Sequence, residues 1–367
     1  MLKRLVNEAH FTLNITTTGP LLIKSSHATV SGPDMTPVLT YRNNDWEVYL
    51  PGSSLKGVFR SHLEKVSRTL RPNPPVVCNP FWALKDKANE NNGRLACPDY
   101  GQLSCSDKFE RRRKKEFKLQ QTWQHPEEKI DNVTAYEESC PICRLFGSTE
   151  FTGRISINDA YLVRSTARKP TEQRDGVGID RLTGGAFPGA LFNLEVVSAG
   201  TMFTTDIHLR NFEIWQLGMV LLAVQDMADG LLQVGSGKSR GLGSVKGEIA
   251  TGVTINHIGQ IPDKNSDKKP DRTSHQVWGL GRFLNDDSYG TQKQVLDTKG
   301  KVKEQGDVLD LIHLPQIEQR GIRQQAIFSG DSLVDLREQA IAQFVQRMDT
   351  WSVPPKMSDF AQLGFRR

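Results

Sequence analysis

Apolar residues recur at helical spacing in three stretches of the chain. The first stretch runs from about Leu55 to Leu70, the second from about Phe212 to Gln233 and the third from about Leu333 to Met348. In each stretch the apolar positions fall on one face, which predicts three amphipathic helices. Polar residues that can accept a backbone hydrogen bond mark their starts. The expected start signals are Ser53 or Ser54 for the first helix, Asn211 for the second, and Ser332 and Asp335 for the third.

Alternating apolar and polar residues predict strands between these helices. We expect the segments 191–197 and 202–209 to pair, because only Ser198-Ala199-Gly200 separates them. The predicted order is strand, helix, strand, strand, helix, strand, which is the order of an α+β, ferredoxin-like fold. Such folds leave one sheet face for a partner, and related folds bind single-stranded RNA, although the fold alone does not define a function. The expected strands are Phe11–Ile15, Ile155–Val163, Leu191–Val197, Met202–Leu209 and Val245–Ile249.

Three long polar insertions interrupt this order, at residues 72–139, 164–190 and 255–330. Insertions of this length in a compact domain are usually functional or disordered. We therefore expect one α+β domain over residues 1–254. A polar insertion and a C-terminal helical extension would follow over residues 255–367.

Composition narrows the class of protein only a little. The chain has 367 residues, of which 37% are hydrophobic and 24% are charged, as in ordinary globular proteins. No apolar run approaches the roughly 20 residues of a membrane span, and the N-terminus lacks a signal-peptide pattern, which predicts a cytoplasmic protein with no membrane partner. The net charge of +5 permits a polyanionic partner without requiring one. A basic block at 108–115 is either a solvated segment or a nucleic-acid contact.

The five cysteines all lie in the first half of the chain. Cys140-Pro141-Ile142-Cys143 forms half of a zinc site, because a gap of two residues lets both thiolates reach one metal ion. We select Cys97 and Cys105 as the second pair, since Pro98 and the turn at Gly101 can fold the segment between them. Cys78 and His125 remain alternatives. Four thiolates would make a closed, structural zinc site, whereas the alternative is a set of buried free cysteines.

The segment Pro51–Gly57 combines features of a phosphate site. Gly52 and Gly57 free the backbone, Ser53 and Ser54 offer hydroxyls, and the first N–H groups of a helix are unpaired. Lys56 and Arg60 follow one helical turn apart. On these grounds a capped helix with two solvated cations is an equally good interpretation.

A second glycine-rich run covers residues 235–243. Its Gly237-Lys238-Ser239 is similar to a nucleotide-binding P-loop, but Leu232 stands where that motif needs glycine. The run also follows a helix and precedes a strand, whereas a P-loop links a strand to a helix. We interpret it as a flexible loop in which Lys238 and Arg240 suit a nucleic-acid backbone, or as a plain connection.

Three segments together resemble a known family. One segment resembles the hallmark of the RAMP superfamily, and in particular that of the backbone subunit of type III CRISPR effectors. It is Leu50-Pro51-Gly52-Ser53-Ser54-Leu55-Lys56-Gly57, together with Arg60. The run at 235–243 resembles the glycine-rich loop of these subunits. The stretch 178–186 resembles the hairpin that they insert between guide and target RNA. The resemblance covers roughly residues 8–250.

This resemblance implies partners and site residues. The partners would be guide RNA, complementary target RNA and other subunits of the effector complex. It also implies a zinc-binding insertion at about 72–150 and a hairpin insertion at about 164–190, in which Ile179 and Leu182 could wedge between bases. An ordinary surface hairpin is the alternative. The implied RNA contacts are Ser53, Ser54, Lys56, Arg60, Arg174, Arg181, Lys238 and Arg240.

The resemblance further implies a catalytic residue, Asp34, in the loop 32–38. Target RNA would be cleaved by attack of the adjacent 2′-hydroxyl, with magnesium or manganese, and Asp34 would hold the metal, orient the nucleophile or take its proton. The alternatives are an aspartate that only forms a turn and a subunit that only scaffolds RNA. Many relatives have Leu-His-Ile-Gly where this chain has Leu21-Leu22-Ile23-Lys24, and His27 is out of register. Separate processing of the guide is therefore not expected.

Overall fold

The computed structural model describes residues 4–25, 32–78, 104–106, 109, 132–163, 170–258, 276–283, 295–296, 302–304 and 307–351. Cys97, His27, His125 and most of the basic block at 108–115 lie outside these residues. No helix within the described ranges is long and apolar enough to cross a membrane.

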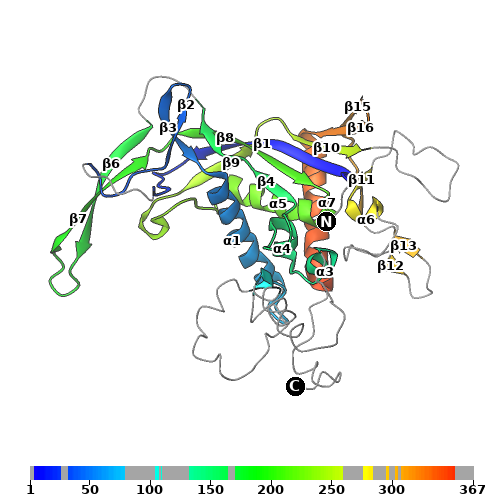
Figure 1. Cartoon of the computed structure of the whole chain (residues 1–367), viewed down its shortest axis with the longest axis horizontal. Helices are drawn as coiled ribbons and strands as arrows, with labels where there is room; N and C mark the ends of the chain where they lie inside the picture. Colours follow the sequence, from blue (N-terminus) through cyan, green and yellow to red (C-terminus); the bar gives the residue numbers. More distant parts are fainter. Residues whose placement is uncertain are drawn as a thin grey trace, which may run out of the picture.

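A ten-stranded antiparallel sheet forms the centre of the molecule (Figure 1). Strand β1 (Asn7–Thr17) lies in its middle and pairs with three other strands. Its odd-numbered residues are buried, whereas His10, Thr12 and Asn14 face the other side, as the alternation predicts. Along the sheet the order is β15 (Gln316–Arg320), β16 (Arg323–Phe328), β10 (Val253–Ile258), β1, β8 (Met202–Arg210), β5 (Ala160–Leu162), β3 (Asp45–Leu50) and β2 (Leu39–Arg42); β4 (Ile155–Ile157) also pairs with β8, and β9 (Val245–Ile249) with β1.

Three two-stranded sheets lie outside the central one. The largest is a long hairpin of β6 (Thr171–Ile179) and β7 (Ala186–Val197), which projects away from the body (Figure 1). The others pair β11 (Gln276–Trp278) with β14 (Val308–Asp310) and β12 (Val295–Leu296) with β13 (Val302–Glu304).

Three long helices, α1 (Gly52–Leu70), α5 (Ile214–Ala228) and α7 (Gly330–Thr350), lie on one side of the sheet (Figure 1). Helices α5 and α7 cross closely, because a Cβ at Gly218 would collide with the backbone of Ala340. Shorter helices in the described residues are α3 (Asn132–Glu137), α4 (Pro141–Phe146), η3 (Lys238–Arg240) and α6 (Leu280–Phe283).

The start of α1 differs from the prediction. The helix begins at Gly52, so Ser53 and Ser54 lie inside its first turn, and neither caps it. The carboxylate of Asp159, in the connection after β4, accepts the Gly52 N–H at 2.7 Å. A side chain distant in sequence thus stabilises the helix start and lets the helix begin earlier.

The other two helices also begin at residues different from the expected ones. Glu213 caps α5 through a capping box with Gln216, whereas Asn211 binds the backbone of the N-terminal segment. Helix α5 ends at Ala228 because Gly230 adopts a left-handed conformation, with φ of 76°. Ser329 caps α7, and Ser332 is only its partner in that cap. Asp335 instead accepts backbone N–H groups from Ile312 and His313.

The expected pairing of segments 191–197 and 202–209 is wrong. Strand β7 pairs with β6, whereas β8 pairs with β1, β4 and β5. Thr17 separates the two strands: its backbone accepts the Gly200 N–H at 2.7 Å and donates to Thr201 at 2.9 Å. The chain therefore leaves the hairpin and enters the central sheet at this turn.

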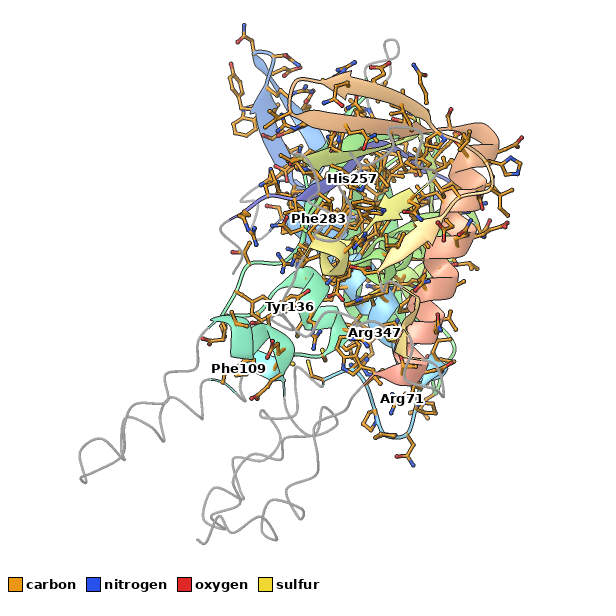
Figure 2. All side chains as sticks on the ribbon, turned by 90° about the vertical axis from the view of Figure 1, so that its right-hand side faces the viewer. Arg71, Phe109, Tyr136, His257, Phe283 and Arg347 are labelled. Atoms are coloured by element: carbon orange, nitrogen blue, oxygen red, sulfur yellow. The ribbon has the colours of Figure 1, made fainter. Side chains whose placement is uncertain are left out.

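The C-terminal part of the chain is joined to the same sheet and helices. Strand β10 pairs with β1 and with β16, so the sheet continues across residue 254. Arg71, after α1, donates to the carbonyls of Met348, Asp349 and Trp351 at the end of α7 (Figure 2).

Candidate metal centre and nucleic-acid interface

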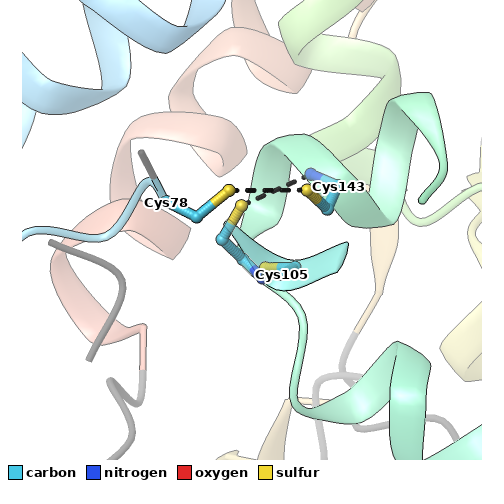
Figure 3. Close-up of side chains that lie close together, drawn as sticks. Cys78, Cys105 and Cys143 are labelled. Carbon is cyan, nitrogen blue, oxygen red and sulfur yellow. Dashed lines mark hydrogen bonds between the residues drawn. The ribbon is translucent and has the colours of Figure 1, made fainter. Parts of the chain in front are cut away.

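Four buried cysteines, Cys78, Cys105, Cys140 and Cys143, form a cluster in which all sulfur atoms lie within 4.8 Å of one another. Figure 3 shows Cys78, Cys105 and Cys143 converging from separate segments. Cys78 follows α1, Cys105 belongs to the insertion, and Cys140 caps helix α4 next to Cys143. The prediction of a cysteine metal site is therefore confirmed as a cluster that could hold a metal ion such as zinc.

The cluster has the dimensions and donors of a tetrahedral zinc site. The sulfur atoms of Cys78 and Cys143 are 3.6 Å apart. Zinc–sulfur bonds of about 2.3 Å place the ligands of a tetrahedral site about 3.8 Å apart. The backbone N–H of Cys140 points at the Cys105 sulfur (3.3 Å), and that of Cys143 points at the Cys140 sulfur (3.4 Å). Such donors stabilise thiolates, which are the form that binds metal.

Cys105, Cys140 and Cys143 affect one another's ionisation. Burial opposes a charge on Cys140, yet hydrogen bonds from the neighbouring cysteines bring the pKa of its thiol well below the usual value. Hydrogen bonds within the cluster raise the pKa of Cys105 and Cys143. A bound divalent cation would remove this conflict by stabilising all four charges together.

The second cysteine pair differs in part from the predicted one. Cys78 completes the cluster in the described part of the chain, whereas Cys97, which we selected from the sequence, lies outside it. A signal for Cys78 was present in the sequence. It follows the predicted helix 55–70 after a connection of seven residues, and this helix packs against α4, so Cys78 can reach the Cys140–Cys143 pair.

Lys56 and Arg60, the predicted phosphate contacts of α1, both bind protein groups. Lys56 donates to the carbonyl of Ile155 at 3.3 Å. Arg60 donates to Glu64 at 3.1 Å and to the Cys143 sulfur at 3.4 Å. Burial disfavours the charged guanidinium, but Cys143 and Glu64 outweigh it and raise the pKa of Arg60. Both cations are half-buried rather than fully presented to solvent.

The exposed face of α1 carries two serines, a glycine and a lysine. Ser53, Gly57, Ser61 and Lys65 recur every four residues and are all exposed. No atom lies within 4 Å of the position that a Cβ at Gly57 would occupy. The spacing of four could have identified this face from the sequence. Ser61 and Lys65 were not among the predicted RNA contacts, which ended at Arg60.

The glycine-rich loop, residues 235–243, joins α5 to β9, in the predicted order. Partial burial and the nearby charge of Lys65 lower the pKa of Lys238, so the loop brings a second cation close to α1. Gly235 and Gly243 have positive φ, and a Cβ on either would collide with backbone carbonyls. These two glycines therefore fix the path of the loop, while Lys238, Ser239 and Arg240 remain exposed.

Asp34 is exposed at the base of the hairpin. Its carboxylate accepts the backbone N–H of Asn193, in β7, at 2.9 Å. Met35 also exchanges backbone hydrogen bonds with β7, at Asn193 and Glu195. The described residues include no group of three or more potential metal ligands around Asp34. A magnesium or manganese ion here would need most of its ligands from RNA and water, and its presence stays a prediction.

The β6–β7 hairpin is attached through one face and exposed over the other. Phe192 lies across Gly176 and packs with Leu22, Leu194 and Leu242, so the hairpin base touches the glycine-rich loop. Towards the tip, Ile179 is 57% and Leu182 is 97% exposed. Arg174 is exposed and binds Glu172 at 2.7 Å, and Arg181 is exposed at the turn.

A comparison with known families adds to this geometry. The family model of the RAMP superfamily matches residues 14–246, which is more than half of the chain. No curated protein matches the sequence. The matched range includes the end of β1, all of α1, the four clustered cysteines, the hairpin and the glycine-rich loop. The chain therefore belongs to the RAMP superfamily.

Proposed function

We propose that this member of the RAMP superfamily is a guide-RNA-binding subunit of a type III-like CRISPR effector complex. Membership of the superfamily supports the RNA-binding and CRISPR-associated part of the proposal. The observation that carries the rest is the exposed face of α1 together with the exposed cations of the glycine-rich loop, where the charge of Lys65 helps to lower the pKa of Lys238.

Two cations held close together repel each other, and a polyanion between them relieves that repulsion. The neighbouring surface of α1, formed by Ser53, Gly57 and Ser61, has no bulky side chain. An RNA backbone can therefore approach the helix closely, with serine hydroxyls and loop amides as donors. Arg240 would extend this contact along the loop.

We propose a ferredoxin-like core beneath this surface. The sheet order β9–β1–β8–β5 and the crossings through α1 and α5 support it. In this interpretation residues 72–150 are the zinc-binding insertion. The hairpin of residues 171–197 would place Ile179 and Leu182 against RNA bases, and Arg174 and Arg181 near phosphates.

Within the same complex we propose that Asp34 takes part in cleavage of the complementary RNA. The 2′-oxygen would attack the adjacent phosphorus and the bond to the 5′-oxygen would break. The products would carry a 2′,3′-cyclic phosphate and a 5′-hydroxyl. The hydrogen bond from Asn193 supports this role, because it holds the carboxylate in one position at the base of the hairpin.

The test uses the assembled complex with its guide and a labelled complementary RNA. Asp34→Asn keeps the size of the side chain and a hydrogen-bond acceptor but removes the charge. We expect cleavage to fall at least about 100-fold, as for loss of a general acid or base, with RNA affinity unchanged. Asp331→Asn, on the exposed first turn of α7, is the matched control.

The outcomes distinguish a subunit that cleaves RNA from one that only binds it. Cleavage by the wild type that Asp34→Asn leaves intact would contradict the role of Asp34. A complex that binds complementary RNA without cutting it would support the alternative, a structural subunit. Failure of the chain to bind RNA at all would contradict both.

A further inference from the structure

Arg60, Glu64 and Arg68 lie one helical turn apart on the face of α1 that meets the cysteine cluster. The carboxylate of Glu64 binds Arg60 at 3.1 Å and Arg68 at 3.6 Å. Glu64 is a buried residue, with 9% of its surface exposed. One buried carboxylate thus holds two guanidinium groups in place.

Both arginines extend from this carboxylate to the cluster. Arg60 donates to the sulfur of Cys143 at 3.4 Å, and Arg68 donates to the backbone carbonyl of Cys78 at 3.0 Å. Cys78 and Cys143 belong to different segments of the chain, and their sulfur atoms are 3.6 Å apart. Helix α1 therefore contacts two of the four metal-binding residues at the point where their segments meet.

The charges of this arrangement suit a loaded metal site. A zinc ion with four thiolates has a net charge of about −2, and two guanidinium groups beside it supply the opposite charge. Arginine also has the geometry for this role, since its planar fork can donate to a carboxylate and a sulfur at the same time. Groups that bind the ligands of a metal, rather than the metal itself, orient those ligands and tune the affinity.

The same helix presents Ser53, Gly57, Ser61 and Lys65 on its exposed face. We propose that Arg60 and Arg68 are positioning residues of the metal centre, and that through them zinc binding and RNA binding reinforce each other. The second part rests on the proposed function of α1. By linkage, RNA must raise zinc affinity by the same factor by which zinc raises RNA affinity.

The first experiment measures zinc affinity of the full chain by competition with a chromophoric chelator. Arg60→Met should weaken zinc binding by about tenfold or more, as for other residues that support metal ligands. Arg68→Met should weaken it less, because its bond is to a backbone carbonyl. Lys65→Met, on the exposed face of the same helix, should lower RNA affinity but leave zinc affinity unchanged. Unchanged zinc affinity in both arginine variants would overturn the proposal.

Folding is checked by thermal unfolding of each variant with saturating zinc. Arg60→Lys provides a second variant, because it keeps the charge but cannot contact Glu64 and Cys143 through two separate nitrogen atoms. We expect a zinc affinity between those of the wild type and Arg60→Met. A lysine variant as weak as the methionine one would show that geometry, not charge, carries the effect.

The second experiment repeats the zinc titration with a short single-stranded RNA. RNA should raise the zinc affinity of the wild type several-fold and that of Arg60→Met by less. RNA binding without any change in zinc affinity would overturn the coupling. If the zinc-loaded wild type binds no RNA, the proposed function is contradicted and the coupling falls with it, whereas the effect of Arg60 on zinc affinity is decided by the first experiment.

Discussion

The cysteine cluster lies where distant segments of the chain meet, whereas the β6–β7 hairpin consists of two strands that are neighbours in sequence. Every cysteine of the cluster is buried, and side chains of α1 bind Cys143 and Cys78, while Cys140 and Cys143 lie at the start of α4. In the hairpin, by contrast, Leu182 is 97% exposed, and among the described strands β6 pairs with β7 alone. The cluster brings separate segments of the chain together in the interior, while the hairpin leaves apolar side chains exposed to solvent.

This difference indicates two separate uses of apolar surface. Buried side chains around the cluster stabilise the fold, and their loss should be felt in stability. Exposed ones on a projecting hairpin contribute little to folding, and contiguous exposed apolar surface usually marks a contact with a partner. Substitutions of exposed residues in the hairpin should therefore change RNA binding with little effect on stability.

The largest effect on stability should come from Cys78→Ser. Loss of one ligand opens the site, so bound zinc should fall from about one ion per chain to nearly none. A stability loss on the order of 4 kcal/mol is expected for a lost structural metal. For a chain of 367 residues each kcal/mol lowers Tm by roughly 1–2 °C, and thermal unfolding with metal analysis measures both.

Cys97→Ser is the matched control for this change. Cys97 was the ligand that we selected from the sequence, whereas Cys78 completes the cluster. Zinc content and Tm should stay at their wild-type values in Cys97→Ser. Loss of zinc in that variant, with Cys78→Ser unaffected, would return Cys97 to the site.

An intermediate effect should distinguish the two glycines of α1. A Cβ at Gly52 would collide with the backbone of Ile157 and Asn158, so Gly52→Ala should cost roughly 2 kcal/mol through overpacking. Gly57→Ala meets no neighbour and should stabilise the helix by up to about 1 kcal/mol. Chemical denaturation measures both changes.

Gly57→Ala also tests the RNA surface. If RNA lies against α1, the added methyl group should weaken RNA binding although it stabilises the protein. A variant that is more stable and binds RNA as tightly as the wild type would place the RNA elsewhere.

The smallest effect on stability is expected at the hairpin. Replacing Ile179 and Leu182 together by alanine should change the free energy of unfolding by no more than about 0.5 kcal/mol. The same variant should bind complementary RNA more weakly once the guide is in place, because the apolar contact of these side chains with the bases is lost. Phe192→Ala, at the packed base of the hairpin, should instead destabilise the protein by roughly 2 kcal/mol.

Local patterns in the sequence identified elements and motifs but not their partners. The helical stripe from Leu55 to Leu70 and the alternation in Phe11–Ile15 were found in the structure as α1 and β1. The capping residues were predicted wrongly for all three helices. At α1 the capping group is Asp159, which is remote in sequence, and at α7 the helix begins at Gly330, earlier than the apolar stripe indicates.

In the candidate site, too, local patterns identified some residues but not the residues that they contact. Cys140 and Cys143 could be predicted as ligands because their spacing alone lets both reach one metal ion. The choice among the remaining cysteines depended on how the insertion folds back on α1, which no local pattern encodes. Likewise, the sequence indicated that Arg60 is a cation near a helix start, but not that its guanidinium turns to Cys143.

The sequence by itself determined that this is an α+β protein with a glycine-rich loop, a Pro-Gly-Ser-Ser helix start and a pair of cysteines spaced to share one metal ion. These features rest on periodicity, spacing and residue chemistry, which act over a few residues. Only the tertiary structure decided that Cys78 completes the cluster, that β7 pairs with β6, and that Arg60 and Arg68 tie the cluster to α1. Contacts of this kind join residues far apart in the chain, and they form only when the packing of the whole domain brings those residues together.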